Sequence, residues 1–508
     1  MSYLRGVDRK EVQLLPASVE EYVGPEHEVR LLEGFVEGLD LVAAGLERKA
    51  AAKTGRPGYA PGDLLKLWLW GYVNGVMSSR KLERECGRNL EVLWLLRGLR
   101  PDHWTICAFR RQAGPGLKAV LRQFTLLAQG LKWVEGRLVV IDGTKLKASN
   151  HPQRQLKAEV AKKKIAALDA QLESYLRGCE EADAGVVEGL APVEELQAQR
   201  TALEEQQQQM EQSGRKALPL TDPECRSMRK VGLGYNAQLA VDPVHHLIVA
   251  AEVVEASNDQ QQLVKVAEAA RANLELDPAT PLQVVADAGY YDRASLLAAE
   301  AANLQAYVPR PRKGSGQEKG RFHKSQFAYD PKADAYRCPG EVLLRRETQT
   351  RKSGVLVYFY ANAKACRQCP LKGQCTIADY RRVERWEHEA VLDRAEARLA
   401  AAPQMMKLRR SVVEHPFGTI KFWNGQGTLL TRGLAGAQTE FTLSALAYNL
   451  KRLLKLQPIS ELLAAFARGV FDLLKLSNLL PRLTTPSLAF VFIAQAKTIS
   501  PLPRFLPT

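Results

Sequence analysis

The sequence has few aromatic residues, few cysteines and no long apolar run. Aromatics make up 7% of the 508 residues, and cysteine occurs 8 times. No run reaches the roughly 18 apolar residues that a membrane-spanning helix needs. The opening residues are mixed and acidic, without the apolar region of a secretory signal. We therefore expect a cytoplasmic protein that is not associated with a membrane, whose cysteines are reduced thiols or metal ligands.

Acidic residues are also fewer than basic ones. The chain has 71 Lys and Arg against 56 Asp and Glu, a net charge of +15. Such an excess favours a polyanionic partner, because Lys and Arg gain affinity by releasing counterions from phosphates. The alternative is a basic protein with no such partner. The length and the 46% hydrophobic content predict a globular protein with more than one folded unit.

Residues 1–130 have the pattern of helices. Apolar residues recur at helical spacing from Leu64 to Val76, a short helix follows at 90–98, and a basic helix begins near Ile106. Arg110 and Arg111 lie on that last helix. Helix, turn and helix with arginines on the last element is compatible with DNA binding, and an ordinary helical bundle is the alternative.

Two apolar runs each end in an acid. Residues 138–141 lead into Asp142, and residues 282–286 lead into Asp287. Short apolar runs of this kind predict buried strands. If the two strands are neighbours in one sheet, their carboxylates lie side by side, as two-metal phosphoryl transfer requires.

Three other acids compete with this pair. Asp242 lies in a turn, Asp259 at the expected start of a helix where it can act as a cap, and Asp292 is close enough to Asp287 to replace it.

The segments between and after these runs predict an α/β protein with an RNase H-like mixed sheet, spanning 131–456. The expected elements are strands at 233–241, 247–254 and 305–308 and helices at 260–274 and 293–303. Two insertions interrupt this domain: a helical hairpin at 155–220 and a basic, cysteine-containing segment at 309–400. Residues 457–508 form an apolar, proline-interrupted tail to which we assign no function.

A third acid, Glu414, lies in an expected helix among basic residues. Arg410 precedes it by four positions and Lys421 follows it by seven, so that the three lie near one helix face. Such a face can present a metal ligand between cations that bind phosphate. A plain salt bridge on a helix surface is the alternative.

Cys338, Cys366, Cys369 and Cys375 are close enough in sequence to supply four thiolates to one Zn²⁺. Their spacing is not the paired CxxC of a zinc ribbon, and four metal-free thiols are the other interpretation.

Short motifs in a fixed order give the chain a resemblance to bacterial insertion-sequence transposases of the DDE class, most closely to the insertion-sequence eleven-eighty-two family. The motifs are Ser78–Glu83, Arg100–Ile106, Ile141–Lys145, Thr221–Pro223, Gly234–Gln238, Ala286–Tyr291, Val413–Lys421 and Ala447–Leu450.

The resemblance implies a catalytic triad of Asp142, Asp287 and Glu414 that holds two Mg²⁺ or Mn²⁺ ions. It implies double-stranded DNA as partner, both terminal inverted repeats and target, with a homodimer in the synaptic complex. Related families have a Tyr, Arg, Glu, Lys pattern around the last acid. Here Arg409 or Arg410 and Lys421 match as phosphate contacts, but Met406 or Lys407 stands where the Tyr is expected.

Two other functions remain open at this point. A nuclease with the same core would cleave DNA without joining strands, although the flanking domain and insertions argue against it. An inactive transposase-derived DNA-binding protein would have lost an acid, and all three are present.

Overall fold

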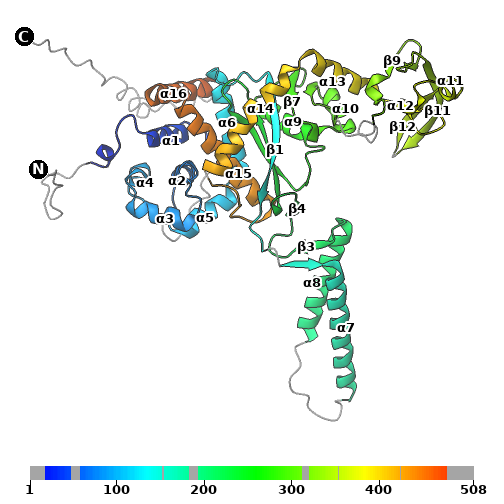
Figure 1. Ribbon diagram of the computed structural model, residues 1–508. Helices are drawn as coiled ribbons and strands as arrows, with labels where there is room; N and C mark the ends of the chain where they lie inside the picture. The colour runs from blue at the N-terminus through cyan, green and yellow to red at the C-terminus, as the bar shows by residue number, and fades with distance from the viewer. Residues whose placement is uncertain are drawn as a thin grey trace, which may run out of the picture.

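The computed structural model describes most of the chain (Figure 1). The described residues are 18–46, 58–151, 154–181, 193–311, 320–352, 354–423 and 425–476. A central mixed sheet carries the helical N-terminal body at one end, and two further parts project from it. None of the helices in these ranges is both long and apolar enough to cross a bilayer.

The central sheet has six strands in the order β4-β5-β1-β7-β8, with β6 also paired to β5. Their bounds are β1 Leu138–Lys147, β4 Arg226–Met228, β5 Gly232–Val241, β6 Ile248–Val254, β7 Leu282–Val285 and β8 Leu304–Tyr307. β5 is antiparallel to β1, β4 and β6, whereas β7 is parallel to both β1 and β8. The prediction of a mixed α/β protein is therefore confirmed.

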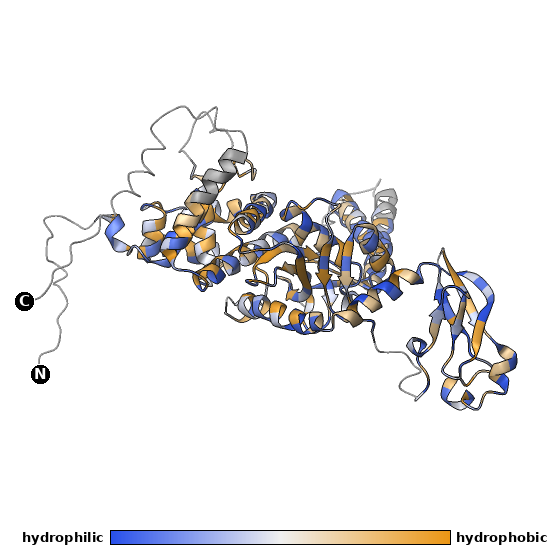
Figure 2. Cartoon of the chain, turned by 90° about the horizontal axis from the view of Figure 1, so that it is seen from above, coloured by the Kyte–Doolittle hydropathy of each residue, from blue (hydrophilic) through white to orange (hydrophobic). Residues whose placement is uncertain are grey.

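Burial explains why the two predicted runs form neighbouring strands. Val139, Val140 and Ile141 of β1 are completely buried, as are Val284 and Val285 of β7. A parallel strand that is covered on both faces has a continuous run of apolar residues in its sequence. The middle of the molecule is accordingly dominated by hydrophobic strands in Figure 2.

Helices pack on both sides of this sheet. They are α9 Leu263–Asn273, α10 Arg293–Ala301, α13 Glu389–Ala401, α14 Gln404–Gly418 and α15 Gly433–Leu454. α15 is buried along most of its length and contacts β6 as well as helices α2 (Pro61–Val73) and α6 (Gly114–Gly130) of the N-terminal body. Through α15 the sheet and the N-terminal helices share one hydrophobic core.

The N-terminal body consists of short helices. They are η1 Val19–Tyr22, α1 Glu28–Glu37, α2 Pro61–Val73, α3 Ser79–Arg88, α4 Leu90–Leu95, α5 His103–Gln112 and α6 Gly114–Gly130. Helix α16 (Ile459–Leu476), from the segment expected to be a tail, packs against α1. Its Phe466 ring lies 5.9 Å from the ring of Phe35. The first part of the tail therefore belongs to this body, while 477–508 lie outside the described residues.

Two parts project from the sheet (Figure 1). Helices α7 (Ala158–Glu181) and α8 (Val193–Gln212) form a hairpin whose base is the two-stranded sheet β2 (Gln155–Lys157) and β3 (Ala217–Pro219).

The second projection is an antiparallel five-stranded sheet, which we call the cysteine lobe. It contains β9 Ala328–Asp330, β10 Ala335–Arg337, β11 Leu343–Lys352, β12 Val355–Ala361 and β13 Val383–Trp386, with short helices η5 Lys324–Gln326, α11 Ala363–Arg367 and α12 Lys372–Cys375. It has its own small core and stands at one end of the molecule (Figure 2).

Candidate active site

The two predicted strand-end acids lie at matching positions of neighbouring parallel strands. Val140 of β1 pairs with Val285 of β7, and two residues further along each chain come Asp142 and Asp287. One nitrogen of Arg409, on α14, contacts both carboxylates, at 2.8 Å from Asp142 Oδ2 and 3.4 Å from Asp287 Oδ2. The structure thus brings Asp142 and Asp287 together, bridged by one guanidinium.

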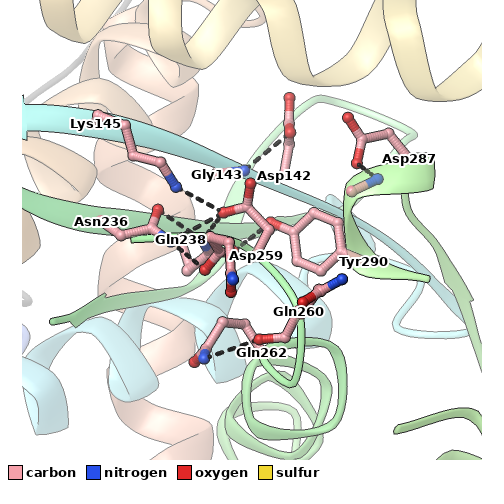
Figure 3. Close-up of polar contacts among 12 residues, drawn as sticks. Asp142, Gly143, Lys145, Asn236, Gln238, Asp259, Gln260, Gln262, Asp287 and Tyr290 are labelled. Carbon is pink, nitrogen blue, oxygen red and sulfur yellow. Dashed lines mark hydrogen bonds and ion pairs between the residues drawn. The ribbon is translucent and has the colours of Figure 1, made fainter. Parts of the chain in front are cut away.

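Local backbone contacts orient the two carboxylates (Figure 3). Oδ1 of Asp142 accepts a hydrogen bond from the backbone N–H of Gly143 at 2.9 Å. Oδ1 of Asp287 accepts one from the backbone N–H of Gly289 at 2.8 Å, which starts the short helix η3 (Ala288–Tyr290). In each case Oδ1 is held by the chain, and Oδ2 faces Arg409.

Burial disfavours the charge on Asp142. It raises the pKa of Asp142 to about 6, against the opposing pull of Arg409 and of the Gly143 hydrogen bond, and with a smaller contribution from the nearby charge of Asp287. A carboxylate in this state gains much from a cation, because a positive charge restores the ionised form.

A third carboxylate, Asp259, lies close to this pair and was missed as a site residue from sequence. Its Oδ1 accepts hydrogen bonds from Lys145 Nζ at 3.0 Å, Asn236 Nδ2 at 2.9 Å and Gln238 Nε2 at 2.8 Å. The expected capping role is wrong: α9 begins at Leu263 with Gln262 as its N-cap. No pattern in the sequence separates this Asp from a capping Asp, because its partners come from β1 and β5.

The Asp259 network extends under the aspartate pair (Figure 3). The buried hydroxyl of Tyr290 donates to Oε1 of Gln238, whose amide nitrogen reaches Asp259. Burial raises the pKa of Tyr290, and the charges of Asp259, Asp142 and Asp287 add to that shift. A Cβ at Gly143 would overlap Gln238 Nε2 and lie 2.8 Å from Asp259 Oδ1, so any other residue would displace these side chains where β1 passes the network.

Arg409 and Arg410 have different positions. Arg409 is largely buried against the aspartates, with 19% of its side chain exposed. Arg410, by contrast, is exposed to solvent. The sequence alone left both as phosphate contacts.

Glu414 is not part of the gathered cluster. It lies on α14 with an exposed side chain, and no described residue forms a hydrogen bond or ion pair with it. Lys421 lies in the π-helix η6 (Thr419–Trp423) that follows, and its ammonium donates to the backbone carbonyl of Lys145 on β1 at 2.9 Å. Burial lowers the pKa of Lys421, and the charge of Lys145 adds to that effect.

The two arginines of α5 also differ. Arg110 is only 5% exposed; its guanidinium lies 4.4 Å from the ring of Trp68, and Nη1 donates to the carbonyl of Met77 at 3.2 Å. It is a core residue of the N-terminal body, which corrects its assignment as a DNA contact. Arg111 is exposed.

The competing acids have structural roles. Asp242 is completely buried and accepts backbone hydrogen bonds from Glu135, Gly136 and Val244. Asp292 caps α10 through the backbone N–H and hydroxyl of Ser295, both at 2.9 Å. Neither replaces Asp287.

The four cysteines converge in the cysteine lobe. Cys338, Cys366, Cys369 and Cys375 line one small hollow together with apolar side chains such as Phe327 and Leu344. Burial raises the pKa of Cys375, with contributions from the Arg381 charge, which lowers it, and from the other three thiols. Cys86, Cys107 and Cys225 are free thiols elsewhere, and the side chain of Cys179 lies outside the described residues.

Within the described ranges, no group of three or more His, Cys, Asp or Glu side chains is already arranged to hold a metal ion. At the aspartate pair the donor chemistry still fits Mg²⁺ or Mn²⁺, because two hard carboxylate oxygens already share one cation there. At the cysteine lobe the ligand type fits Zn²⁺, but the sulfurs are not yet in a coordinating arrangement.

Two family models match parts of the chain. Residues 17–112 match the transposase domain DUF772, and residues 337–454 match a transposase DDE domain. No curated protein matches the chain. The second match includes Glu414, Lys421 and the four clustered cysteines, and it begins after Asp142 and Asp287. These matches support a DDE transposase.

Proposed function

We propose that the chain is an insertion-sequence DDE transposase that cleaves DNA at the terminal inverted repeats of its element and joins the ends to target DNA. The observation that carries this proposal is the pairing of Asp142 with Asp287 at matching positions of parallel strands, sharing one cation. The sheet order and strand directions support an RNase H-like core, and the two family matches support the transposase class.

In this proposal Asp142, Asp287 and Glu414 hold two Mg²⁺ or Mn²⁺ ions. When bound, these ions supply Lewis-acid stabilisation of the attacking and leaving oxygens of an in-line phosphoryl transfer. The strands fix the two aspartates, and the backbone N–H groups of Gly143 and Gly289 set their rotamers. Asp259 positions the ammonium of Lys145 three residues beyond Asp142, where it can face a DNA phosphate.

DNA contacts in this proposal come from exposed cations near the site and on the N-terminal body. Arg410 lies on the outer face of α14, and Arg111 lies at the end of α5. Lys421 is tied to the Lys145 carbonyl, so it supports β1 in the DNA-free protein and is available to a phosphate only if that bond opens. The net charge of +15 adds a general attraction for DNA.

Joining requires two element ends to be held together, so we propose a homodimer in the synaptic complex, acting in the bacterial cytoplasm on nucleoid DNA. A nuclease with the same chemistry is the second candidate, because the aspartate pair alone does not distinguish cleavage from joining.

The test uses labelled DNA carrying the terminal repeats that flank the coding region, with Mg²⁺ and an unlabelled target. A transposase gives cleaved ends and joined products of higher molecular weight. A nuclease gives cleaved ends only. Scrambled repeat ends are the matched control, and equal cleavage of both substrates would contradict the inverted-repeat specificity.

A further inference from the structure

Arg409 and Glu414 lie on one helix but face different directions. An α-helix has 3.6 residues per turn, so residues five apart are about 140° apart around its axis. Arg409 lies on the face of α14 that also buries Val412 and Val413, against the ends of β1 and β7. Glu414 lies on the exposed face. With α14 in this orientation, Arg409 faces the aspartate pair and Glu414 faces away from it.

The guanidinium group of Arg409 does not form all the hydrogen bonds that it could. One terminal nitrogen contacts both carboxylates, but Nε is buried and has no hydrogen-bond partner among the described residues. A buried donor without a partner costs free energy. The arrangement therefore neutralises two neighbouring carboxylates at the expense of one unsatisfied group, as expected for a contact that can be exchanged.

The helix ends in an irregular segment. Pro416 lies inside α14, where it removes one backbone hydrogen bond, and the π-helix η6 follows directly at Thr419. A π turn contains one more residue than an α turn, and converting one into the other rotates the preceding helix by about 100°. Such π segments occur preferentially at functional sites.

We propose that Arg409 is the resident counter-ion of the Asp142–Asp287 pair, that a divalent cation displaces it, and that α14 then turns to bring Glu414 toward the pair. Arg409 is thus a positioning residue, which keeps the two carboxylates together until the metal arrives. This inference rests on the proposed function, since it takes both aspartates as metal ligands.

The first test is Mn²⁺ titration by calorimetry of the full-length chain without DNA. The apparent affinity for a metal falls with the fraction of molecules whose site is free, so Arg409→Gln should bind Mn²⁺ roughly fivefold more tightly or better. Arg410→Gln removes the same charge from the exposed neighbour and should bind as wild type does. Arg409→Lys keeps the charge without the planar fork and should lie between. Arg409→Gln binding no tighter than Arg410→Gln overturns the proposal.

A second readout follows the helix itself. Backbone amide exchange in residues 404–423 should change when Mn²⁺ is added to wild type, and Arg409→Gln should show part of that change without metal. Identical exchange in all three states overturns the turning of α14.

Failure of this inference is distinguishable from failure of the proposed function. If Asp142→Asn and Asp287→Asn abolish Mn²⁺ binding while Arg409→Gln leaves it unchanged, only the role of Arg409 is wrong. If Mn²⁺ binding is absent, or is unaffected by both aspartate variants, the metal site and the inference are wrong together.

Discussion

Oδ1 of Asp259 accepts a hydrogen bond from Nζ of Lys145 at 3.0 Å, and this contact joins the loop before α9 to the strand that carries Asp142. Burial alone would raise the pKa of Asp259, but hydrogen bonds from Asn236 and Lys145 outweigh it and hold the pKa below its usual value. Asp259 is therefore a charged group at neutral pH, and it fixes the position of a cation beside the aspartate pair.

The first prediction concerns this contact. Asp259→Asn keeps the size of the side chain but removes the charge that holds Lys145. We expect the maximal cleavage rate to fall by about 10- to 100-fold, because the ammonium that Asp259 holds beside the aspartate pair loses its position. The KM for DNA should change less than the rate does, because other exposed cations, such as Arg410 and Arg111, supply most of the proposed DNA contacts.

Asp292→Asn is the matched control for that experiment. Asn caps a helix about as well as Asp, so α10 and cleavage should both be preserved. Equal loss in both variants, or a large fall in melting temperature in Asp259→Asn alone, would assign Asp259 a purely structural role.

The second prediction concerns stability and pH. The pKa of Asp142 is raised from 3.8 to about 6 in the folded protein, so the folded state binds a proton more readily than the unfolded state does. Wild type therefore gains stability as the pH falls from about 6 toward 4, and it lacks that contribution at pH 7.

Asp142→Asn removes the cost of keeping this buried charge. At pH 7 without metal, the free energy of unfolding of Asp142→Asn should exceed that of wild type, by an amount on the order of 2 kcal/mol. The difference should shrink as the pH falls toward 4. Denaturant unfolding at pH 7, 6, 5 and 4 measures it, and a variant less stable than wild type at pH 7 would contradict the burial argument.

The third prediction separates the two arginines of α5. Arg110→Ala removes a guanidinium packed on Trp68 and should destabilise the chain by on the order of 2 kcal/mol. Arg111→Ala should leave the melting temperature unchanged and weaken DNA binding, reducing the slope of log affinity against log salt by about 1. A melting temperature that falls in Arg111→Ala, or an unchanged one in Arg110→Ala, would reverse the assignment.

The fourth prediction concerns the cysteine lobe. Its separate core contains Phe327, Tyr336, Leu344, Tyr360 and Val383, which is small for an independent sheet. We propose that a Zn²⁺ held by the four clustered thiolates supplements this core. Elemental analysis of protein purified without chelator should find one zinc per chain.

Chelation should lower the melting temperature of the cysteine lobe if that zinc is structural. Cys369→Ser should lose the zinc, whereas Cys107→Ser, outside the lobe, should keep it. If the purified protein contains no zinc and a chelator leaves its melting temperature unchanged, the four cysteines are ordinary thiols.

Asp142 and Asp287 could be located from the sequence because a buried strand consists of apolar residues. Each of the two strands therefore appears as an apolar run that ends in an acid. The same physics made the central strands predictable, since Val139 to Ile141 and Val284 to Val285 are buried on both faces. What depends on tertiary contacts was not predictable. Asp259 has the local pattern of a helix cap, and its partners Lys145 and Gln238 lie on β1 and β5, 114 and 21 positions away in the sequence.

The orientation of helix α14 was also not predictable from the sequence. Arg409 and Arg410 are adjacent in sequence, and a rotation of about 100° decides which of them meets the aspartates. Spacing relative to Glu414 places Arg410 with the acid, and the structure indeed leaves both on the exposed face. The burial of Val412 and Val413 and the π-helix after α14 determine which face of the helix packs on the sheet. Residue spacing alone does not predict either of them.

The most direct measurement is the rate of strand cleavage at a terminal-repeat end in saturating Mg²⁺, for wild type, Asp142→Asn, Asp287→Asn and the control Asp292→Asn. We predict that each of the first two variants loses more than about a hundredfold in rate, because each removes a proposed metal ligand and not a supporting group. Asp292→Asn should cleave as wild type does. Cleavage near the wild-type rate in either Asp142→Asn or Asp287→Asn would contradict the account.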